Sequence, residues 1–310
     1  QSKALQKKID EKTMFNKEGH SSFIYHLSDL HLGPKKKLKA VSNLLDSMDE
    51  CDQYAHSPHS KQVFITGDLM NSPNTKNMYQ ANSFMTMIRK RYKADITFVL
   101  GNHDMIVKGL SIGGRQRTKV IAYLLGEKIK VIEKDKIILV KIDSNAGGNL
   151  ARGMITRRQL DQIDSELAGI ENLEDYTIVV LLHHHVFKVS KSDFLKIRWR
   201  EKSIFGSILD KSKALVDANM FATWLQQRHI KYVLHGHKHV PYFMNKNGTY
   251  YISAGSATGG LKESESHYYS YNVLRYDYMD KKMKTCLIFY DDNKKAERKR
   301  VEVYLMEEDK

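Results

Sequence analysis

Residues 22–31 read Ser-Phe-Ile-Tyr-His-Leu-Ser-Asp-Leu-His, a short apolar run followed by two metal-binding side chains, Asp29 and His31. The run is rich in β-branched and aromatic residues, which is typical of a buried strand. Open α/β sheets place their ligand sites just beyond the carboxyl ends of their strands. The stretch therefore predicts an α/β fold with a metal site at the end of a strand.

The same arrangement recurs four more times along the chain. Apolar runs at residues 62–66, 96–100, 177–182 and 231–234 each precede a polar cluster. The clusters are Gly67-Asp68, Gly101-Asn102-His103-Asp104, His183-His184-His185 and Gly236-His237-Lys238-His239. Any one of them alone is a common turn or helix cap. Chance does not readily place five of them directly after predicted strands, so we expect all five at one site.

The five clusters supply enough ligands for two metal ions. A dinuclear centre needs about four protein ligands for each metal and one shared carboxylate, with the ions roughly 3.5–4 Å apart. One set is Asp29, His31, Asp68 and His239, and the other set is Asp68, Asn102, His183 and His237. Mixed carboxylate, amide and imidazole donors favour iron, manganese or zinc over magnesium or calcium. Cysteine is absent from all five clusters, which excludes a thiolate zinc site.

These motifs resemble those of the calcineurin-like metallophosphoesterases, and within that family they are most similar to the cyclic-nucleotide phosphodiesterase-like branch, class III. Three further segments look like the same branch, at residues 139–167, 218–239 and 251–256, and the resemblance covers residues 23–258. It implies a four-layer α/β/β/α sandwich of two mixed sheets flanked by helices. It also implies hydrolysis of a phosphoester.

One segment departs from the family pattern. The family usually follows its paired histidines with proline, whereas this chain has a third histidine, His185, and then Val186. The metal ligand within the triplet is therefore open: the position directly after the strand favours His183, and His184 is the alternative. A histidine of the triplet that does not bind metal, His184 first, is a candidate for substrate binding.

The chemistry expected of such a site needs an activated water and an acid. A water or hydroxide that bridges two cations has its pKa pulled towards neutrality and can attack phosphorus. Negative charge then builds on the leaving oxygen, where a nearby imidazolium can protonate it. His103 flanks the predicted ligand Asn102 but is not needed as a ligand, so we predict that His103 is this acid. We predict that Asp104 orients it.

The charge of the chain points to an anionic substrate. Lys and Arg number 50 against 36 Asp and Glu, a formal charge of +14. The insertion at residues 188–213 carries eight basic and three acidic residues, with aromatics interleaved. Lys196, Arg198 and Arg200 in this insertion are candidate substrate-binding residues, because a basic strip with aromatic faces can hold a nucleotide or a single strand. The alternative is a helical lid whose aromatic side chains pack inward.

Two enzymatic functions fit these observations best. The resemblance favours a phosphodiesterase that acts on a nucleotide-type substrate, and the basic charge favours a nuclease that acts on nucleic acid. A phosphomonoesterase and a non-catalytic binding scaffold are less favoured alternatives, and the complete ligand set argues against a scaffold that has lost catalysis. The sequence does not identify the substrate, the metals or the oligomeric state.

The predicted organisation is an N-terminal extension at residues 1–20, a catalytic domain at 21–260 and C-terminal strands at 261–310 that extend the second sheet. The predicted C-terminal strands lie at residues 272–278, 284–290 and 300–306, where the sequence alternates with the strand period. Two cysteines without a site-like spacing favour a reducing compartment, so we expect a cytoplasmic protein. No apolar run approaches the length of about 18 residues that a membrane span requires.

Overall fold

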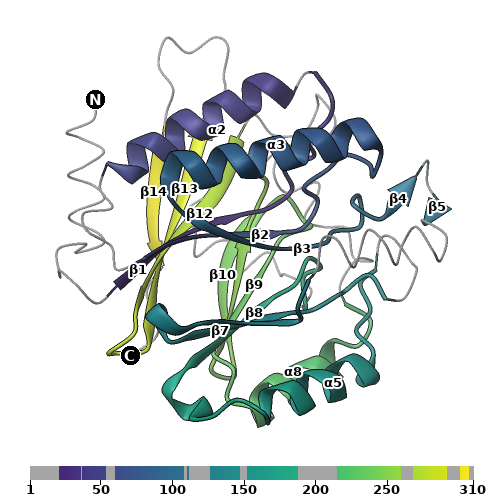
Figure 1. Cartoon of the computed structure of the whole chain (residues 1–310), viewed down its shortest axis with the longest axis vertical. Helices are drawn as coiled ribbons and strands as arrows, with labels where there is room; N and C mark the ends of the chain where they lie inside the picture. Colours follow the sequence, from purple (N-terminus) through teal and green to yellow (C-terminus); the bar gives the residue numbers. More distant parts are fainter. Residues whose placement is uncertain are drawn as a thin grey trace.

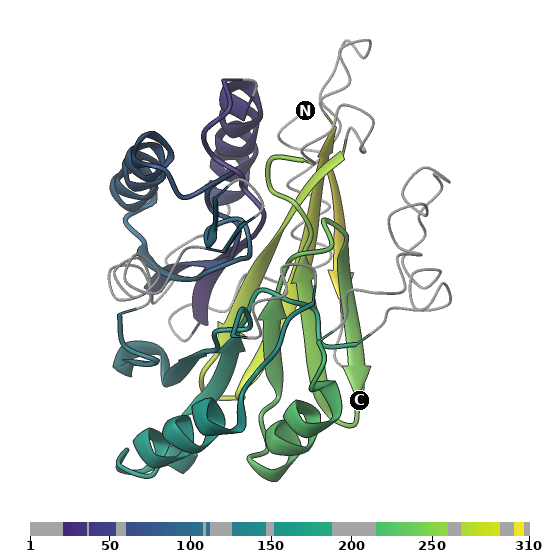
Figure 2. The same ribbon diagram turned by 90° about the vertical axis from the view of Figure 1, so that its right-hand side faces the viewer.

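The computed structural model describes residues 21–35, 37–53, 60–107, 110–111, 126–146, 152–187, 215–259, 268–291 and 301–306. Within these residues, two six-stranded sheets pack face to face, and each carries a pair of helices on its outer face (Figures 1 and 2). The architecture is the four-layer α/β/β/α sandwich of two mixed sheets that the sequence predicts. The N-terminal extension 1–20 and the basic insertion 188–213 lie outside the described residues.

The first sheet has the strand order β14-β13-β12-β1-β2-β3. Its strands are β1 (Ser21–Leu27), β2 (Ser60–Thr66), β3 (Asp95–Val99), β12 (Tyr268–Asp277), β13 (Lys282–Asp291) and β14 (Val301–Met306). The strands β1, β2 and β3 are parallel, and the helices α2 (Lys37–Asp52) and α3 (Thr75–Tyr92) connect them. Because both crossovers lie on one face of the sheet, α2 and α3 lie side by side over it (Figure 1).

The second sheet has the strand order β10-β11-β9-β8-β7-β6. Its strands are β6 (Ile129–Ile132), β7 (Ile137–Lys141), β8 (Thr177–Leu181), β9 (Tyr232–His235), β10 (Pro241–Lys246) and β11 (Thr249–Ala254). The four central strands are parallel, and the two edge strands pair antiparallel. The helices α5 (Arg157–Leu167) and α8 (Ala218–Gln227) cover its outer face (Figure 2).

Three apolar layers hold the sandwich together, and β1 shows how. Its side chains alternate between the two faces of the sheet. Phe23, Tyr25 and Leu27 pack under α2 and α3, whereas Ile24 packs against the second sheet. Both faces of β1 are therefore buried, which explains why its sequence is a nearly continuous apolar run.

The remaining described elements are short. They are the strands β4 (Ile106–Val107) and β5 (Leu110–Ser111) and the 3-10 turns η1 (Glu133–Asp135) and η2 (Leu173–Asp175). None of the described helices combines the length and the apolar composition needed to cross a lipid bilayer.

The C-terminal strands join a different sheet from the one predicted. We expected them to extend the second sheet, but β12 pairs antiparallel with β1, and β13 and β14 follow outward from it. They thus extend the sheet that begins with β1. Alternating sequence indicates that a segment is a strand but not which edge it joins, and here the edge of β1 opposite β2 accepts it.

Candidate metal centre

The predicted ligands lie just past the carboxyl ends of strands from both sheets. Asp29 and Asp68 each stand two residues beyond a strand of the first sheet, β1 and β2. His183 and His237 each stand two residues beyond a strand of the second sheet, β8 and β9. The loops are tied to one another by backbone hydrogen bonds, from Asp29 N to Gly67 O (3.0 Å) and from His31 N to Asp68 O (2.9 Å). The site is therefore built where the two sheets meet.

The first predicted set of donors converges on one point. The Nε2 atoms of His31 and His239 lie 3.2 Å apart, and His239 Nε2 lies 3.2 Å from Asp29 Oδ1. His31 Nε2 lies 3.9 Å from both Asp29 Oδ1 and Asp68 Oδ2. All four side chains are buried or half-buried. The donor atoms of Asp29, His31 and His239 lie within 4.8 Å of one another, and Asp68 Oδ2 adjoins His31. Two imidazole nitrogens among these donors suit a transition-metal ion.

The second predicted set converges beside the first. His183 Nε2 lies 3.0 Å from Asn102 Oδ1 and 3.5 Å from Asp68 Oδ2. His237 Nδ1 lies 3.1 Å from Asn102 Oδ1 and 3.2 Å from His183 Nε2. The Oδ2 atom of Asp68 thus stands between His31 of one set and His183 of the other, where a shared carboxylate belongs.

Both carboxylates are held so that one oxygen faces the donors. Asp29 Oδ2 accepts from the Ser28 hydroxyl (2.6 Å) and from His237 N (2.9 Å), while its Oδ1 is buried without a well-aligned hydrogen bond and has His239 Nε2 as a neighbour at 3.2 Å. Asp68 Oδ1 accepts from His103 N at 2.8 Å, which leaves Oδ2 towards the imidazoles. A buried carboxylate oxygen without a partner costs free energy unless a cation satisfies it. The residues present therefore fit a bound metal.

The histidine triplet separates into different roles. His183 Nδ1 donates to the Thr66 carbonyl (2.8 Å), which leaves the Nε2 lone pair for the donor cluster. His184 instead places Nδ1 2.8 Å from the Ser144 hydroxyl, and its ring lies 4.4 Å from that of His237. The His185 ring stacks on His237 at 5.7 Å. The geometry favours His183 over His184 as the ligand of the triplet.

His103 lies at the rim of the cluster. It is more exposed than its neighbours Asn102 and Asp104, and its ring meets that of His31 edge-on at 4.7 Å. Its Nδ1 lies 3.2 Å from the Asn71 carbonyl, to which the N–H donates. Its ring also lies close enough to His31 and Asp68 to count among the groups that could hold a metal.

Asp104 does not orient His103, contrary to the sequence prediction. Its two carboxylate oxygens accept from the backbone amides of Met70 (2.8 Å), Gly101 (2.9 Å) and Leu69 (3.2 Å). The Asp104 carboxylate therefore joins the loops after β2 and β3. The Asn71 carbonyl, and not Asp104, accepts the hydrogen bond from His103 Nδ1. Burial and the nearby Asp68 carboxylate raise the pKa of Asp104 to about 7.

Protonation of the cluster depends on burial and on Asp68. Burial lowers the pKa of His31 to about 3, and it also lowers the pKa of His237. Burial opposes the charge on Asp68, but the surrounding imidazoles, His183 first, hold the pKa of this carboxyl well below its usual value. Burial also opposes the charge on His183, yet Asp68 raises its pKa to about 9. A metal ion held by His183 would therefore compete with a proton for its Nε2.

The backbone of the site is strained. Eleven non-glycine residues in the described part of the chain have positive φ, and five of them are predicted ligands. They are Asp29, His31, Asp68, His237 and His239, with φ between 45° and 75°. Left-handed backbone is uncommon for residues with a side chain and costs about 1–3 kcal/mol at each position. Such strain is typical of functional sites and aims several short side chains at one point.

Glycines in the motifs make room for the ligands. A Cβ atom on Gly67 would collide with the His183 ring, and one on Gly101 would collide with Asp68. A Cβ atom on Gly236 would collide with Ser28 and Asp29. Each of these three glycines is thus a packing requirement of the site.

Sequence reasoning missed several supporting groups. Ser28 and the Thr66 carbonyl hold predicted ligands, the Asn71 carbonyl holds His103, and Ser144 holds His184. The Ser256 hydroxyl donates to the Asp29 carbonyl (3.0 Å). Most of these contacts use backbone atoms or single hydroxyls, which carry no sequence signature. The predicted substrate-binding residues Lys196, Arg198 and Arg200 lie outside the described residues.

Comparison with known proteins gives one family and several solved structures. The family model described as calcineurin-like phosphoesterase matches residues 24–241. No curated protein sequence gives a match. Among solved structures, GAP50, the anchor in the inner membrane complex of Plasmodium, has a TM-score of 0.54 at 12% identity, over 91% of this chain and 88% of that chain.

Two other solved structures are less similar. Phosphopantetheinyl hydrolase (PptH) from Mycobacterium tuberculosis has a TM-score of 0.47 at 12% identity, over 77% of this chain and 91% of that chain. Wild-type Vps29 complexed with zinc, from Entamoeba histolytica, has a TM-score of 0.39 at 13% identity, over 91% of this chain and 98% of that chain. TM-scores below 0.5 carry no argument for this chain, and at 12% identity the likeness to GAP50 bears on the fold alone.

Proposed function

Because this chain belongs to the calcineurin-like phosphoesterase family, we propose that it is a dinuclear metal-dependent phosphodiesterase that acts on a nucleotide-type substrate. The observation that carries the proposal is the position of Asp68 Oδ2 between His31 Nε2 (3.9 Å) and His183 Nε2 (3.5 Å). One carboxylate oxygen between two sets of donors is what two neighbouring cations require. Manganese, iron and zinc suit these donors.

Metal ions bound here would activate a water and polarise the phosphate oxygens. The protein itself supplies the ligands and their orientation. Asp29 and Asp68 are each tied by a backbone amide on one oxygen, so the other oxygen is already directed before metal binds. His183 is fixed in the same way, because its Nδ1 donates to the Thr66 carbonyl. Such preorganisation limits the reorganisation that catalysis would otherwise cost.

We propose that His103 donates a proton to the leaving oxygen. With Nδ1–H bonded to the Asn71 carbonyl, the protonated ring keeps its Nε2–H for a partner in the site. Its place at the half-exposed rim lets a substrate reach it. In this proposal Asp104 acts on catalysis only through the loops that it joins.

The closest competing function is a nuclease. The formal charge of +14 supports it, since nucleic acids are bound largely through phosphate contacts. Salt dependence separates the two functions, because a polymer releases several counterions on binding and a mononucleotide releases few. Steep loss of affinity with added salt for an oligonucleotide, but not for a cyclic nucleotide, would favour the nuclease.

One activity screen tests the proposal. The metal-free protein is loaded with Mn, Fe or Zn in turn and assayed with bis-p-nitrophenyl phosphate, p-nitrophenyl phosphate, cyclic nucleotides and single-stranded oligonucleotides. We expect the diesters to be cleaved faster than the monoester. Hydrolysis of the monoester alone would support a phosphomonoesterase, and inactivity with every metal would support a non-catalytic scaffold.

The organisation and the location are part of the same proposal. We assign catalysis to residues 21–260, with the basic insertion 188–213 as the substrate-binding element through Lys196, Arg198 and Arg200. His184, buried beside His237, is a further contact of the site. Cys51 and Cys286 are buried and form no disulfide, which supports a reducing compartment such as the cytoplasm.

A further inference from the structure

The outer surface of the first helical layer holds an apolar groove that the metal centre does not use. It lies between α2 and α3 and has a volume of about 280 Å³. Leu32, Val41 and Phe84 are among the residues that line it, and Leu38 of α2 and Tyr79 of α3 stand on its two sides. We call this surface the α2–α3 groove. A wider recess of about 810 Å³ continues along α3 and shares Tyr79, Ser83 and Met87 with it.

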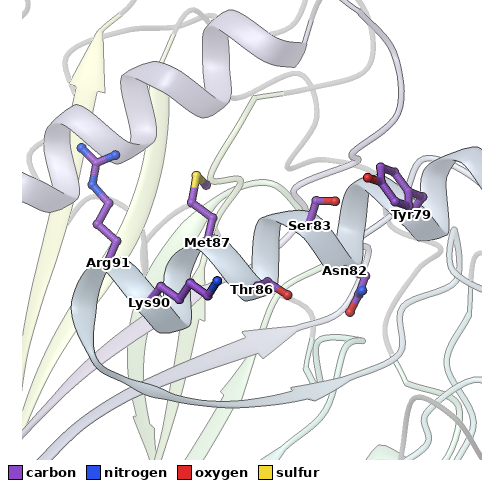
Figure 3. A pocket seen from close by; sticks show the side chains of 7 residues that line it. All are labelled: Tyr79, Asn82, Ser83, Thr86, Met87, Lys90 and Arg91. Carbon is purple, nitrogen blue, oxygen red and sulfur yellow. The ribbon is translucent and has the colours of Figure 1, made fainter.

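Two large apolar side chains of the groove are left in solvent. Leu38 is 65% exposed and Tyr79 is 74% exposed, although most large apolar residues of the described chain are buried. Figure 3 shows Tyr79, Ser83 and Met87 along one side of α3, with Asn82, Thr86 and Lys90 along the other. Apolar side chains that line a recess and stand exposed on both of its sides mark an interaction site.

The charge around the groove has one sign. Residues 33–45 and 71–93, which contain these parts of α2 and α3, hold nine basic residues and no acidic residue. The charged side chains that line the two recesses are Lys37, Lys90 and Arg91, all basic. Lys37 is buried and its ammonium donates to the carbonyls of Thr258 and Gly259, so the charge that faces a partner comes from the exposed lysines around the groove, such as Lys39, Lys76 and Lys90. Acidic residues of α2 begin only at Asp46, and Asp49 is paired with Arg91. The groove therefore combines an apolar floor with a basic surround.

We propose that the α2–α3 groove binds an acidic amphipathic helix of a partner protein. The segment from Tyr79 to Met87 covers about 12 Å along α3, roughly two turns of a bound helix. A helix laid in a groove presents apolar side chains at i, i+3 or i+4, and i+7, and these would enter between Leu38 and Tyr79. Acidic residues on its flanks would face the basic surround.

Other occupants fit the groove less well. The longest segments outside the described residues, 1–20, 112–125 and 188–214, are all net basic, so their charge does not complement the surround. An anionic membrane shares the charge, but its surface is broad. A recess about two helical turns long, with Phe84 only 5% exposed at its floor, suits inserted side chains better than a bilayer surface.

The groove also adjoins the metal centre through the backbone. Leu32 follows His31 in sequence, and its amide donates to the Leu69 carbonyl (2.9 Å). The Leu32 carbonyl accepts from Asn71 N (2.9 Å), and Asn71 holds His103. A partner seated in the groove would therefore lie directly behind the loop that carries Asp29 and His31.

A peptide selection tests the proposal without requiring the enzymatic activity. A random library of peptides of about 16 residues, roughly four helical turns, is selected on the full-length, metal-loaded protein. We expect the recovered sequences to be rich in Asp and Glu and to carry apolar residues at the helical spacing. Recovered sequences without both features would overturn the proposal.

Binding of the most enriched peptide is then measured by fluorescence anisotropy. Leu38→Glu and Tyr79→Glu should each weaken binding by about tenfold or more, because both put an acid where the peptide buries an apolar side chain. Met279→Glu is the matched control, since Met279 is 68% exposed in the turn between β12 and β13 and makes the same charge change elsewhere. All three variants should hydrolyse bis-p-nitrophenyl phosphate at the same rate as the wild-type protein, whatever that rate is.

Equal peptide affinity in the Leu38→Glu, Met279→Glu and wild-type proteins would contradict the proposal. So would binding to phosphatidylserine vesicles that Leu38→Glu abolishes while no peptide is recovered, because the groove would then be a membrane contact.

Discussion

At the scale of single residues, the site depends on which atoms hold each side chain. Asp104 illustrates the point, because its carboxylate accepts three backbone amides from two loops and leaves His103 to the Asn71 carbonyl. The residue that looks catalytic in sequence is thus a scaffold for the ligand loops, and the group that positions the proposed acid is a carbonyl.

Replacing His103 tests its proposed role as an acid. His103→Ala should keep both metals and lose about 10²- to 10⁴-fold in turnover on substrates with alkoxide leaving groups. The loss should be smaller for nitrophenyl esters, whose leaving groups need no proton. Steady-state kinetics on both ester types measure this, with His229→Ala, an exposed histidine, as the control. An equal loss on both types would rule out the acid role.

Replacing Gly101 tests whether the motif glycines make room for ligands. The added Cβ of Gly101→Ala would collide with the Asp68 carboxylate and amide, so metal affinity should fall by about 10- to 100-fold, as for disturbed support of a ligand. Gly169→Ala is the control, because its added Cβ meets only ordinary contact with the Glu166 carbonyl. Calorimetric titration with Mn measures both variants. A metal affinity of Gly101→Ala equal to that of the wild type would show that the loop can shift to accommodate the added Cβ without weakening metal binding.

At the scale of elements, β1 connects the halves of its sheet through a buried histidine. His26 lies 2.9 Å from Thr66 Oγ1 on β2 and 3.1 Å from Asn272 Nδ2 on β12. Asn272 donates to Nδ1, so Nε2 carries the proton and the ring is neutral. Burial lowers the pKa of His26 to about 3 from its ordinary value of 6.5.

This lowered pKa makes the stability of the fold depend on pH. Between pH 6.5 and about 3 the unfolded chain binds a proton at His26 that the folded chain does not, so the free energy of unfolding falls as the pH falls. The contribution of His26 to the slope is at most about 1.4 kcal/mol per pH unit. His26→Gln should flatten the slope by up to that amount, and His229→Gln, which replaces an exposed histidine, is the control. Urea unfolding across this pH window measures it; identical slopes in His26→Gln and the wild type would mean that His26 is not held neutral.

The elements also show what sequence patterns can and cannot predict. Each apolar run before a motif is a strand in the structure, because a strand buried on both faces has to be apolar throughout. The sequence pattern does not predict which strand pairs with which. The alternation at residues 272–278 predicts β12 but does not reveal that β1 is its neighbour, since pairing depends on which edge the rest of the fold leaves open.

At the scale of the whole molecule, both sheets contribute to one centre. The donors from β1, β2 and β3 meet those from β8 and β9 only when the two sheets pack face to face, so the site and the sandwich form together. The motifs predict that the donors of each sheet lie together, because parallel strands of one sheet end at the same edge, but they do not by themselves predict how the two sheets pack. The strained backbone at Asp29, Asp68 and His237 could not be predicted, since it follows from the loops that fit between the sheets.

The metal content of the Mn-loaded protein tests the central claim most directly. Elemental analysis, together with anomalous scattering from crystals, should give two ions in each chain, roughly 3.5–4 Å apart, with the Asp68 carboxylate between them. No more than one ion after loading, or two ions that do not share Asp68, would contradict the dinuclear centre.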